Sequence, residues 1–360
     1  MEKKKVVVGM SGGVDSSVAA YLLKEEGYEV IGVTMQIWQD EDACHLERKG
    51  GCCGVSAVED ARRVADSLDI PYYVMNFKKE FQEKVIDYFV DEYLHARTPN
   101  PCIACNRYVK WESLLQRSLA IGADYIATGH YAQVRLLENG RYTLQMSKIP
   151  DKDQTYALYN LTQDQLSHTL MPDGAYSKPQ IRAIAEQIGL VVANKPDSQD
   201  ICFVEDGDYA GFIEKEIGEK LPEGNFVTAD GEILGRHKGI THYTIGQRKG
   251  LGLAMGHPVF VTEIRPETNE VVIGENEDVF TRALSADKVN WRSIDGLHGQ
   301  PLRAIGKIRY SHKGAACTVT EEGEDRIHVV FDEPVRAVTP GQAVVFYDEE
   351  NCIIGGGTIL

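Results

Sequence analysis

The sequence predicts an α/β protein in which a doubly wound parallel sheet is followed by a small central domain and a C-terminal antiparallel β-barrel. Three observations favour this fold. The run Val6-Val7-Val8 is β-branched throughout, which fits a strand buried on both faces. Segments with strand and helix patterns then alternate as far as Thr128. Beyond Arg303, short segments of period-two alternation are separated by turns, as in a small barrel.

The alternation in the first half of the chain defines the sheet. Helices are expected over 18–26, 58–68, 81–94 and 111–120, and strands over 6–8, 29–35, 72–77 and 125–128. Helical stretches are expected to follow residues 152–156 and to continue through Ile188. Strands that alternate with helices in this way pair in parallel, and their ligands bind beyond the carboxyl ends of the strands. The loop Gly129-His130-Tyr131, which follows the last of these strands, is therefore placed to face a ligand.

Prolines and cysteines mark three expected loops. Pro99 and Pro101 are expected to exclude helix and to stiffen a loop that presents Cys102 and Cys105. The other two loops are 36–54, with Cys44, Cys52 and Cys53, and 196–203, with Cys202.

Composition changes after about Val204, and three domains are expected: 1–204, 205–284 and 285–360. Strands of the last domain are expected over 303–310, 316–320, 326–331, 343–347 and 352–359. Arg309 and Tyr310 fall in the first of these strands, so one of the two is expected to face the barrel core.

The composition indicates in which cellular compartment the protein is expected. The 360 residues are 43% hydrophobic, but no apolar run approaches about 18 residues and no signal peptide follows Lys3-Lys4-Lys5. We therefore expect a cytoplasmic protein that does not enter a membrane. Eight cysteines in a reducing compartment are not expected to form a disulfide framework. Cys317 and Cys352 are expected to be chance core or surface residues.

The net charge of −16 argues against a general nucleic-acid binder, but the charge is unevenly distributed. Residues 233–262 contain no acid although the chain has 54, and residues 288–313 carry six basic residues and one acid. Such segments suit a phosphate backbone. The alternative is that 233–262 is a glycine-rich fold element whose histidines, His237, His242 and His257, are polar turn residues.

Gly12 and Gly13 lie between the first strand and the first helix. Glycines let successive N–H groups point into one concavity at the positive end of a helix, which makes an anion site without a lysine. No Gly-Lys-Ser/Thr ending is present, so this is not a Walker-type loop. A plain connecting loop is the alternative.

The turn Ser11-Gly12-Gly13-Val14-Asp15-Ser16 resembles the signature of the PP-loop ATP pyrophosphatases, which cleave ATP between its α- and β-phosphates and transfer AMP to an oxygen. Further motifs narrow the resemblance to the tRNA-specific 2-thiouridylases, the MnmA family, over nearly the whole chain. These motifs are Thr98-Pro99-Asn100-Pro101 with Cys105-Asn106, Ala127-Thr128-Gly129-His130-Tyr131, Lys152-Asp153-Gln154, Ile201-Cys202-Phe203, Tyr243-Thr244-Ile245-Gly246-Gln247-Arg248 and Pro340-Gly341-Gln342.

The resemblance implies a tRNA-uridine 2-sulfurtransferase that uses ATP and Mg²⁺ to replace the C2 oxygen of the wobble uridine in glutamate, glutamine and lysine tRNAs by sulfur. A carbonyl oxygen is a poor leaving group, so adenylation turns it into AMP before a thiol or persulfide sulfur attacks C2. The sulfur donor is left open between a cysteine desulfurase, a sulfur-relay protein and inorganic sulfide.

The resemblance also implies site residues. The ATP site would comprise Gly9, Met10, Ser11, Gly12, Gly13, Val14, Asp15, Ser16, Met35 and Gly129, with Asp15 as the Mg²⁺ partner. Cys202 would carry the persulfide sulfur, and Cys105 would be the nucleophile that resolves it as a Cys105–Cys202 disulfide. Asn100, Pro101 and Cys102 would line the extruded base. The tRNA contacts would be His130, Lys152, Asp153, Gln154, Arg309, Tyr310 and Gln342.

Cys102 departs from the pattern of the family, in which many members have aspartate at this position. Cys102, Cys105 and Cys202 therefore support a second hypothesis, an iron–sulfur (4Fe-4S) cluster on three thiolates with one iron open to external sulfide. A structural zinc with His130 as its fourth ligand is a third. Cys52 and Cys53 also resemble family residues, but adjacent cysteines are equally typical of small buried hydrophobes.

Two other functions compete with thiolation. An ATP-dependent amidoligase of the same superfamily would need an ammonia-supplying site, which the sequence does not reveal, and would not explain Cys105 with Cys202. A non-catalytic tRNA-binding protein would keep the nucleotide pocket and a structural metal.

Overall fold

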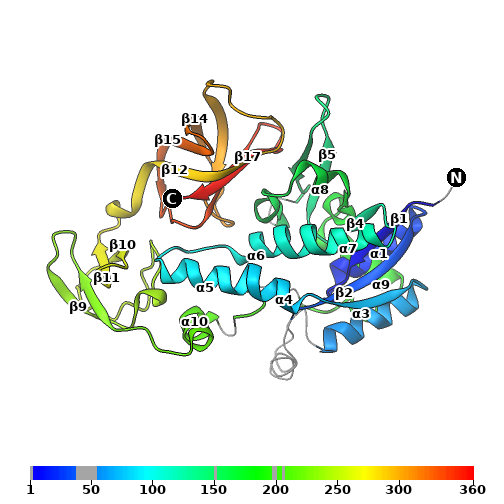
Figure 1. Cartoon of the computed structure of the whole chain (residues 1–360), viewed down its shortest axis with the longest axis horizontal. Helices are drawn as coiled ribbons and strands as arrows, with labels where there is room; N and C mark the ends of the chain where they lie inside the picture. Colours follow the sequence, from blue (N-terminus) through cyan, green and yellow to red (C-terminus); the bar gives the residue numbers. More distant parts are fainter. Residues whose placement is uncertain (1–2, 38–54, 150–151, 197–200, 205–206) are drawn as a thin grey trace. The chain divides into compact units, whose positions relative to one another are not determined.

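The computed structural model describes residues 3–37, 55–149, 152–196, 201–204 and 207–360 (Figure 1). Cys44, Cys52 and Cys53 lie outside these residues, and so does the 197–200 part of the expected polar loop. The chain divides into two units. The first comprises 1–86, 102–202 and 350–353, and the second comprises 87–101, 203–349 and 354–360.

A five-stranded parallel sheet forms the centre of the first unit, which confirms the predicted fold class. Its strands are β1 (Lys5–Gly9), β2 (Glu29–Gln36), β3 (Tyr72–Asn76), β4 (Tyr125–Ala127) and β7 (Thr169–Leu170), in the order β3-β2-β1-β4-β7. Every neighbouring pair is parallel. Val6, Val7 and Val8 are completely buried, as the β-branched run predicts for a central strand.

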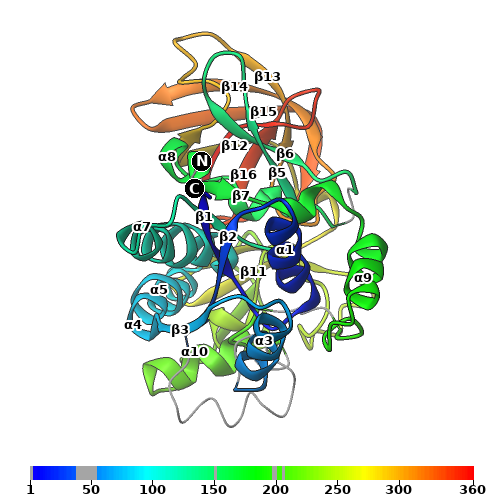
Figure 2. The ribbon, with the colours of Figure 1, turned by 90° about the vertical axis from the view of Figure 1, so that its right-hand side faces the viewer.

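Helices cover both faces of this sheet. Helices α1 (Val14–Glu25), α3 (Val55–Ser67) and α9 (Lys178–Gln187) share one apolar core with Val6 and Val8. Figure 2 shows α7 (Leu115–Ala120) and α4 (Lys78–Phe81) on the opposite side of β1 and β2. This double layer leaves the carboxyl ends of the strands as the open edge of the sheet.

The loop expected around the two prolines is present over residues 97–100, but the expectation was wrong from Pro101 onward. A continuous helical segment begins at Pro101 and comprises α6 (Pro101–Ala104), the π-helix η2 (Cys105–Leu114) and α7. Proline suits the first helical position, because its fixed φ is helical and its missing N–H would have no partner there. Cys102 and Cys105 therefore lie in the first turns of a helix; Cys102 is exposed and Cys105 is half-buried.

The helical stretches expected as far as Ile188 are the 3-10 helix η4 (Thr155–Leu158), α8 (Gln163–Ser167), the 3-10 helix η5 (Pro172–Ala175) and α9, and the short strand β7 interrupts them. The hairpin of β5 (Ala132–Leu136) and β6 (Tyr142–Met146), which precedes them, was not predicted. Helices α8 and α9 each begin with a capping box, at Thr162 and Ser177.

The central part of the second unit is a four-stranded sheet. Its strands are β8 (Gly224–Val227), β9 (Ile233–His237), β10 (Phe260–Arg265) and β11 (Glu270–Gly274), in the order β10-β11-β8-β9. Phe226, Tyr243 and Val261 lie in its apolar core. Helices α5 (Asp87–Leu94) and α10 (Tyr209–Ile217) also belong to this unit, and Phe89 of α5 lies 6.3 Å from Phe212 of α10, centroid to centroid.

The C-terminal segment forms the predicted closed antiparallel barrel. Its strands are β12 (Phe280–Trp291), β13 (Leu302–Lys307), β14 (Ala315–Gly323), β15 (Arg326–Arg336), β16 (Ala343–Tyr347) and β17 (Ile353–Ile359). They close in the order β12-β15-β14-β13-β16-β17. Cys317 is a core residue, and burial raises the pKa of its thiol to about 12. Cys352 is buried as well.

Arg309 and Tyr310 do not continue β13, contrary to the period-two pattern. The strand ends at Lys307, and the N–H of His312 donates to the carbonyl oxygen of Arg309 at 3.0 Å, which closes a turn. The chain must reverse here to pair with β14, so the pattern of the strand extended into the turn by chance. Tyr310 is 47% exposed.

Among the described residues, none of the helices combines the length and apolar character that a membrane span requires.

Candidate functional site

The glycine turn after β1 is packed so closely that side chains are excluded. Gly12 has φ of +68°, and a Cβ placed there would lie 2.3 Å from the carbonyl oxygen of Ala57 in α3. Gly13 is the N-cap of α1 and brings no side chain over the first N–H groups of that helix. The positive end of a twelve-residue helix is therefore open to an anion.

Gly129 brings the loop after β4 to the same place. A Cβ on Gly129 would lie 2.6 Å from the backbone carbon of Asp15 and 2.6 Å from the backbone nitrogen of Ser16. The structure thus brings Gly129 together with the 9–16 turn, as expected from sequence. Met35 is half-buried near the end of β2, the strand that pairs with β1.

Asp15 is the centre of a polar network. The Lys178 ammonium donates to both of its carboxylate oxygens at 2.8 Å, and the Tyr131 hydroxyl donates to one of them at 2.7 Å. Tyr131 is held in turn by Gln154, whose Oε1 accepts from the Tyr131 N–H at 2.9 Å and whose own N–H donates to the Tyr131 carbonyl at 3.0 Å.

A second lysine holds the glycine turn. Lys195 Nζ donates to the carbonyl oxygen of Gly12 at 3.0 Å and to Asp60 of α3 at 2.8 Å. Sequence reasoning missed both Lys178 and Lys195, because they lie more than 160 residues beyond the turn and no spacing rule connects them to it.

These residues fit a nucleotide phosphate chain and a magnesium ion. The open helix end, the glycine turn and two ammonium groups are all suited to phosphate. Asp15 supplies the carboxylate oxygens that Mg²⁺ prefers, and in this structure Lys178 takes the place of a cation there.

Asp173 is a second carboxyl in this region that sequence reasoning missed. It lies in η5, is completely buried, and within the described residues neither of its carboxylate oxygens has a hydrogen-bond partner. Burial raises the pKa of Asp173 well above its ordinary value, the charge of Asp15 raises it further, and Lys178 opposes the shift. Burial and the charge of Asp15 therefore both oppose ionisation of this carboxyl.

The residues predicted to contact tRNA in the first unit differ in exposure. Lys152 is exposed, but Asp153 is buried and accepts hydrogen bonds from Ser147 N–H at 3.2 Å and from the Thr155 hydroxyl at 2.6 Å. His130 is half-buried, with Nδ1 2.7 Å from Thr128 Oγ1 and its ring centroid 5.6 Å from that of Trp111. Burial, and to a lesser extent the charge of Lys110, lowers the pKa of His130 well below its ordinary value, so the ring is neutral.

Cys102, Cys105 and Cys202 do not form a metal site in this conformation. Over the residues that the structure describes, no three His, Cys, Asp or Glu side chains are arranged to hold one metal ion. As placed here, the three cysteines thus do not fit a cluster. Asn100 is half-buried and Pro101 buried.

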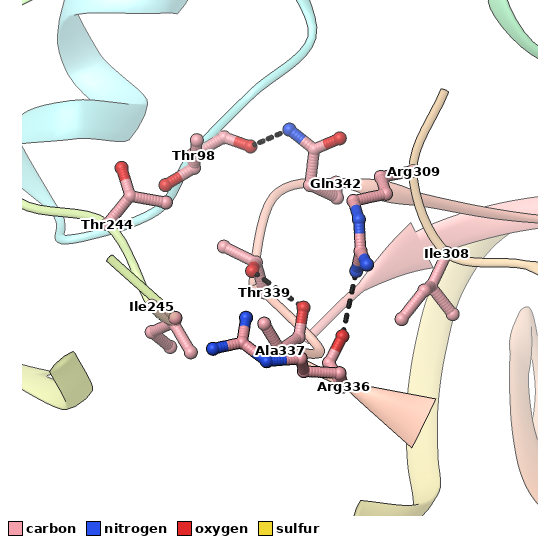
Figure 3. A pocket seen from close by; sticks show the side chains of 10 residues that line it. Thr98, Thr244, Ile245, Ile308, Arg309, Arg336, Ala337, Thr339 and Gln342 are labelled. Atoms are coloured by element: carbon pink, nitrogen blue, oxygen red, sulfur yellow. Dashed lines mark hydrogen bonds between the residues drawn. The ribbon is translucent and has the colours of Figure 1, made fainter. Parts of the chain in front are cut away.

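In the second unit, Arg309 and Gln342 line a cavity of about 280 Å³ (Figure 3). The walls also include Arg336, Thr98 and Thr244, which sequence reasoning did not assign to a site. Arg336 ends β15, where the strand pattern alone gives no indication of a ligand.

The histidines of the acid-free segment are held by protein groups. His237 is buried, its Nε2 donates to Asn269 O at 3.1 Å, and its Nδ1 accepts from the Gly239 N–H at 3.1 Å. Burial lowers the pKa of His237. His257 is paired with Glu275 at 2.8 Å and Arg236 with Glu223 at 3.8 Å, so acids from outside the segment offset part of its charge.

We expect Asp173→Asn to raise stability at neutral pH. A carboxyl whose pKa is raised by folding loses its proton in the unfolded chain first, so wild-type stability falls as the pH rises above about 4. Asparagine has no ionisable proton, so the variant does not lose stability in this way as the pH rises. The advantage of the variant should therefore grow by up to about 1.4 kcal/mol per pH unit until the folded-state pKa is reached.

Urea unfolding of both proteins between pH 4 and pH 8 measures this difference. Asp173→Ala is the matched control: it adds a constant cavity cost but must show the same pH trend. A stability difference between wild type and Asp173→Asn that does not change with pH would contradict the assignment.

Three family models match the chain: the tRNA methyl transferase HUP domain over residues 4–206, the tRNA methyl transferase PRC-barrel domain over 210–275 and the aminomethyltransferase beta-barrel domain over 281–359. Curated relatives match it over nearly its whole length. A tRNA-specific 2-thiouridylase MnmA from Lachnoclostridium phytofermentans is 67% identical over 99% of both chains.

The protein of the same name from Clostridioides difficile is 57% identical, over 99% of this chain and 98% of the relative. The one from Clostridium perfringens is 58% identical, over 100% of this chain and 99% of the relative. Identity at this level along the whole chain, together with the parallel sheet, the glycine turn and the closed barrel, establishes that the chain belongs to the tRNA-specific 2-thiouridylase family.

Proposed function

We propose that this chain is an ATP-dependent tRNA-uridine 2-sulfurtransferase, which converts the wobble uridine of glutamate, glutamine and lysine tRNAs to 2-thiouridine and releases AMP and pyrophosphate. The observation that carries the proposal is the 57% to 67% identity to full-length relatives named tRNA-specific 2-thiouridylase. The open end of α1 beside the glycine turn supports it, because adenylation requires a site for the phosphates of ATP.

In the proposed ATP site, the backbone of residues 9–16 binds the phosphates, and Met35 and Gly129 contact the adenosine. ATP supplies the AMP group that makes the C2 oxygen of the uridine a leaving group. Lys195 keeps Gly12 in place, and Asp15, which now pairs with Lys178, would hold Mg²⁺. Burial and the charge of Asp15 oppose ionisation of Asp173, which would limit the negative charge beside the triphosphate.

In the proposed sulfur step, Cys202 carries a persulfide. Its terminal sulfur attacks C2, and AMP leaves with the former carbonyl oxygen. The Cys105 thiolate then attacks the Cys202 sulfur, so the bond between the two persulfide sulfurs breaks and its electron pair stays on the new 2-thiouridine. The resulting Cys105–Cys202 disulfide must be reduced by an external thiol before the next cycle, and a cysteine desulfurase or sulfur-relay protein must restore the persulfide.

For the tRNA, we propose that Asn100, Pro101 and Cys102 line the extruded base, and that His130, the 152–154 segment, Arg309, Tyr310 and Gln342 contact the RNA. The bonds of Asp153 to Ser147 and Thr155 support a role for this residue in shaping the turn that presents Lys152. We retain 1–204, 205–284 and 285–360 as the proposed functional domains.

Release of pyrophosphate is expected to depend on tRNA. Adenylation needs the uridine oxygen as acceptor, so ATP alone should give a background rate and added wobble-uridine tRNA should raise it. A transcript whose wobble base is cytidine is the matched control and should not stimulate. Release without tRNA would favour an amidoligase, and no release under any condition would favour a non-catalytic binder.

Cys105→Ala and Cys202→Ala should each abolish thiolation while changing the Kd for tRNA by less than about twofold, because neither removes a charge that contacts phosphate. Thiolated tRNA is resolved from unmodified tRNA on a mercury-containing gel. Cys317→Ala, in the barrel core, is the control that should keep thiolation. If either Cys105→Ala or Cys202→Ala thiolates at the parental rate, the assigned chemistry is wrong.

The iron and acid-labile sulfide content of protein purified without oxygen separates the persulfide from the cluster hypothesis. The persulfide route predicts full activity in iron-free protein, with Cys102→Ala active. Near-stoichiometric iron and sulfide that rise and fall with activity would instead make Cys102, Cys105 and Cys202 cluster ligands and inorganic sulfide the donor.

A further inference from the structure

The cavity of about 280 Å³ in the second unit is built for an anion. Its walls come from the connection after α5, the 244–246 loop and the barrel segments 308–309 and 336–342. The ten lining residues include two arginines, three threonines and a glutamine, and no carboxylate. In a chain with a net charge of −16, a cavity with two guanidinium groups and no acid in its walls is a local positive site.

Arg336 supplies one of the two positive charges of the cavity. Its guanidinium carbon lies 4.9 Å from the centre of the Phe260 ring, and within the part of the chain that the structure describes no carboxylate forms an ion pair with it. Figure 3 shows this guanidinium turned toward Ile245. A cation stacked on an aromatic face keeps its donors available for a second partner.

Arg309 is fixed beside it. Its Nη1 donates to the backbone carbonyl oxygen of Arg336 at 2.7 Å, the contact drawn in Figure 3. Both arginines line the same cavity, so an anion bound there would be attracted by two positive charges.

The walls are rigid, so the site is preformed. Gly246 has φ of +85°, and a Cβ there would lie 2.6 Å from the Cβ of Ala337, which is itself in the left-handed region with φ of +56°. Thr98 is tied by both backbone groups: its N–H donates to Pro340 O at 2.8 Å and its carbonyl accepts from Gln342 Nε2 at 2.8 Å.

We propose that this cavity binds a backbone phosphate of the tRNA and that Arg336 is its anchoring cation. Guanidinium groups form charge-assisted hydrogen bonds to phosphate oxygens, and such contacts fix the position of an RNA without reading its sequence. The inference rests on the proposed tRNA substrate. Free inorganic phosphate has the same chemistry, and the experiment below distinguishes the two sources.

The position of Thr98 in the sequence indicates what a phosphate bound in the cavity would do. It stands two residues before Asn100, the first residue proposed to line the target base. A phosphate bound against Thr98 would fix the RNA backbone at a defined place relative to the start of that segment. The cavity would act as a positioning site, whose loss weakens tRNA binding but leaves the chemistry of the cysteines unchanged.

The test is the salt dependence of tRNA binding. One lost phosphate contact lowers the slope of log K against log salt concentration by about 0.7 to 0.9. Arg336→Met keeps the apolar stem on Phe260 and should show this decrease, and Arg336→Lys should restore the slope because it restores the charge. Arg326→Met is the matched control: Arg326 is exposed and begins β15, the strand that Arg336 ends, about 33 Å away along the strand.

A second arm titrates the wild type and Arg336→Met with inorganic phosphate alone and follows the thermal midpoint. An unchanged slope in Arg336→Met overturns the inference, and so does an equal decrease in Arg326→Met. Stabilisation by phosphate that needs Arg336, with an unchanged tRNA slope, would make the cavity a small-anion site instead. Failure of the proposed function is distinct from these outcomes, because it would appear as the absence of thiolation in the wild type.

Discussion

The candidate nucleotide site depends on close approach between backbones, which three glycines permit. Gly12 touches Ala57 of α3, and Gly129 touches the backbone of Asp15 and Ser16, at distances where a Cβ would clash. Gly13 leaves the end of α1 uncovered. The sheet brings these segments to one edge, but the missing side chains allow them to meet and leave N–H groups exposed to an anion.

The charged side chains at this edge of the sheet are two lysines paired with aspartates and one buried aspartate. Lys178 and Lys195 are held by Asp15 and Asp60, so the site without phosphate carries paired ions. Asp173 is completely buried, and burial and the charge of Asp15 both oppose its ionisation. An incoming triphosphate would therefore meet two ammonium groups that could exchange their present carboxylate partners for phosphate.

Sequence predicted the parts of this structure that depend on local pattern. Val6-Val7-Val8 identified the central strand, the glycine turn identified the helix end, and the alternation after Arg303 identified the barrel. Local sequence pattern gave wrong predictions where the position of a residue within an element determines its structure. Pro101 starts a helix because it occupies the first turn, and Arg309 leaves its strand because the chain must reverse there. Lys178, Lys195 and Arg336 could not be found, since tertiary folding alone brings them to their sites.

The contact of Gly129 with α1 also connects two binding events. The backbone of Asp15 and Ser16 touches Gly129. Two residues later, the N–H of Tyr131 donates to the side-chain oxygen of Gln154 and the carbonyl oxygen of Tyr131 accepts from the N–H of Gln154, which lies two residues after the exposed Lys152. A ligand that displaces the first turn of α1 therefore displaces a surface proposed to contact RNA. Thermodynamic linkage makes such an effect mutual. If a bound nucleotide changes the affinity for RNA by some factor, bound RNA changes the affinity for the nucleotide by the same factor. The affinity of such a fold for each of its two substrates would therefore depend on whether the other is bound.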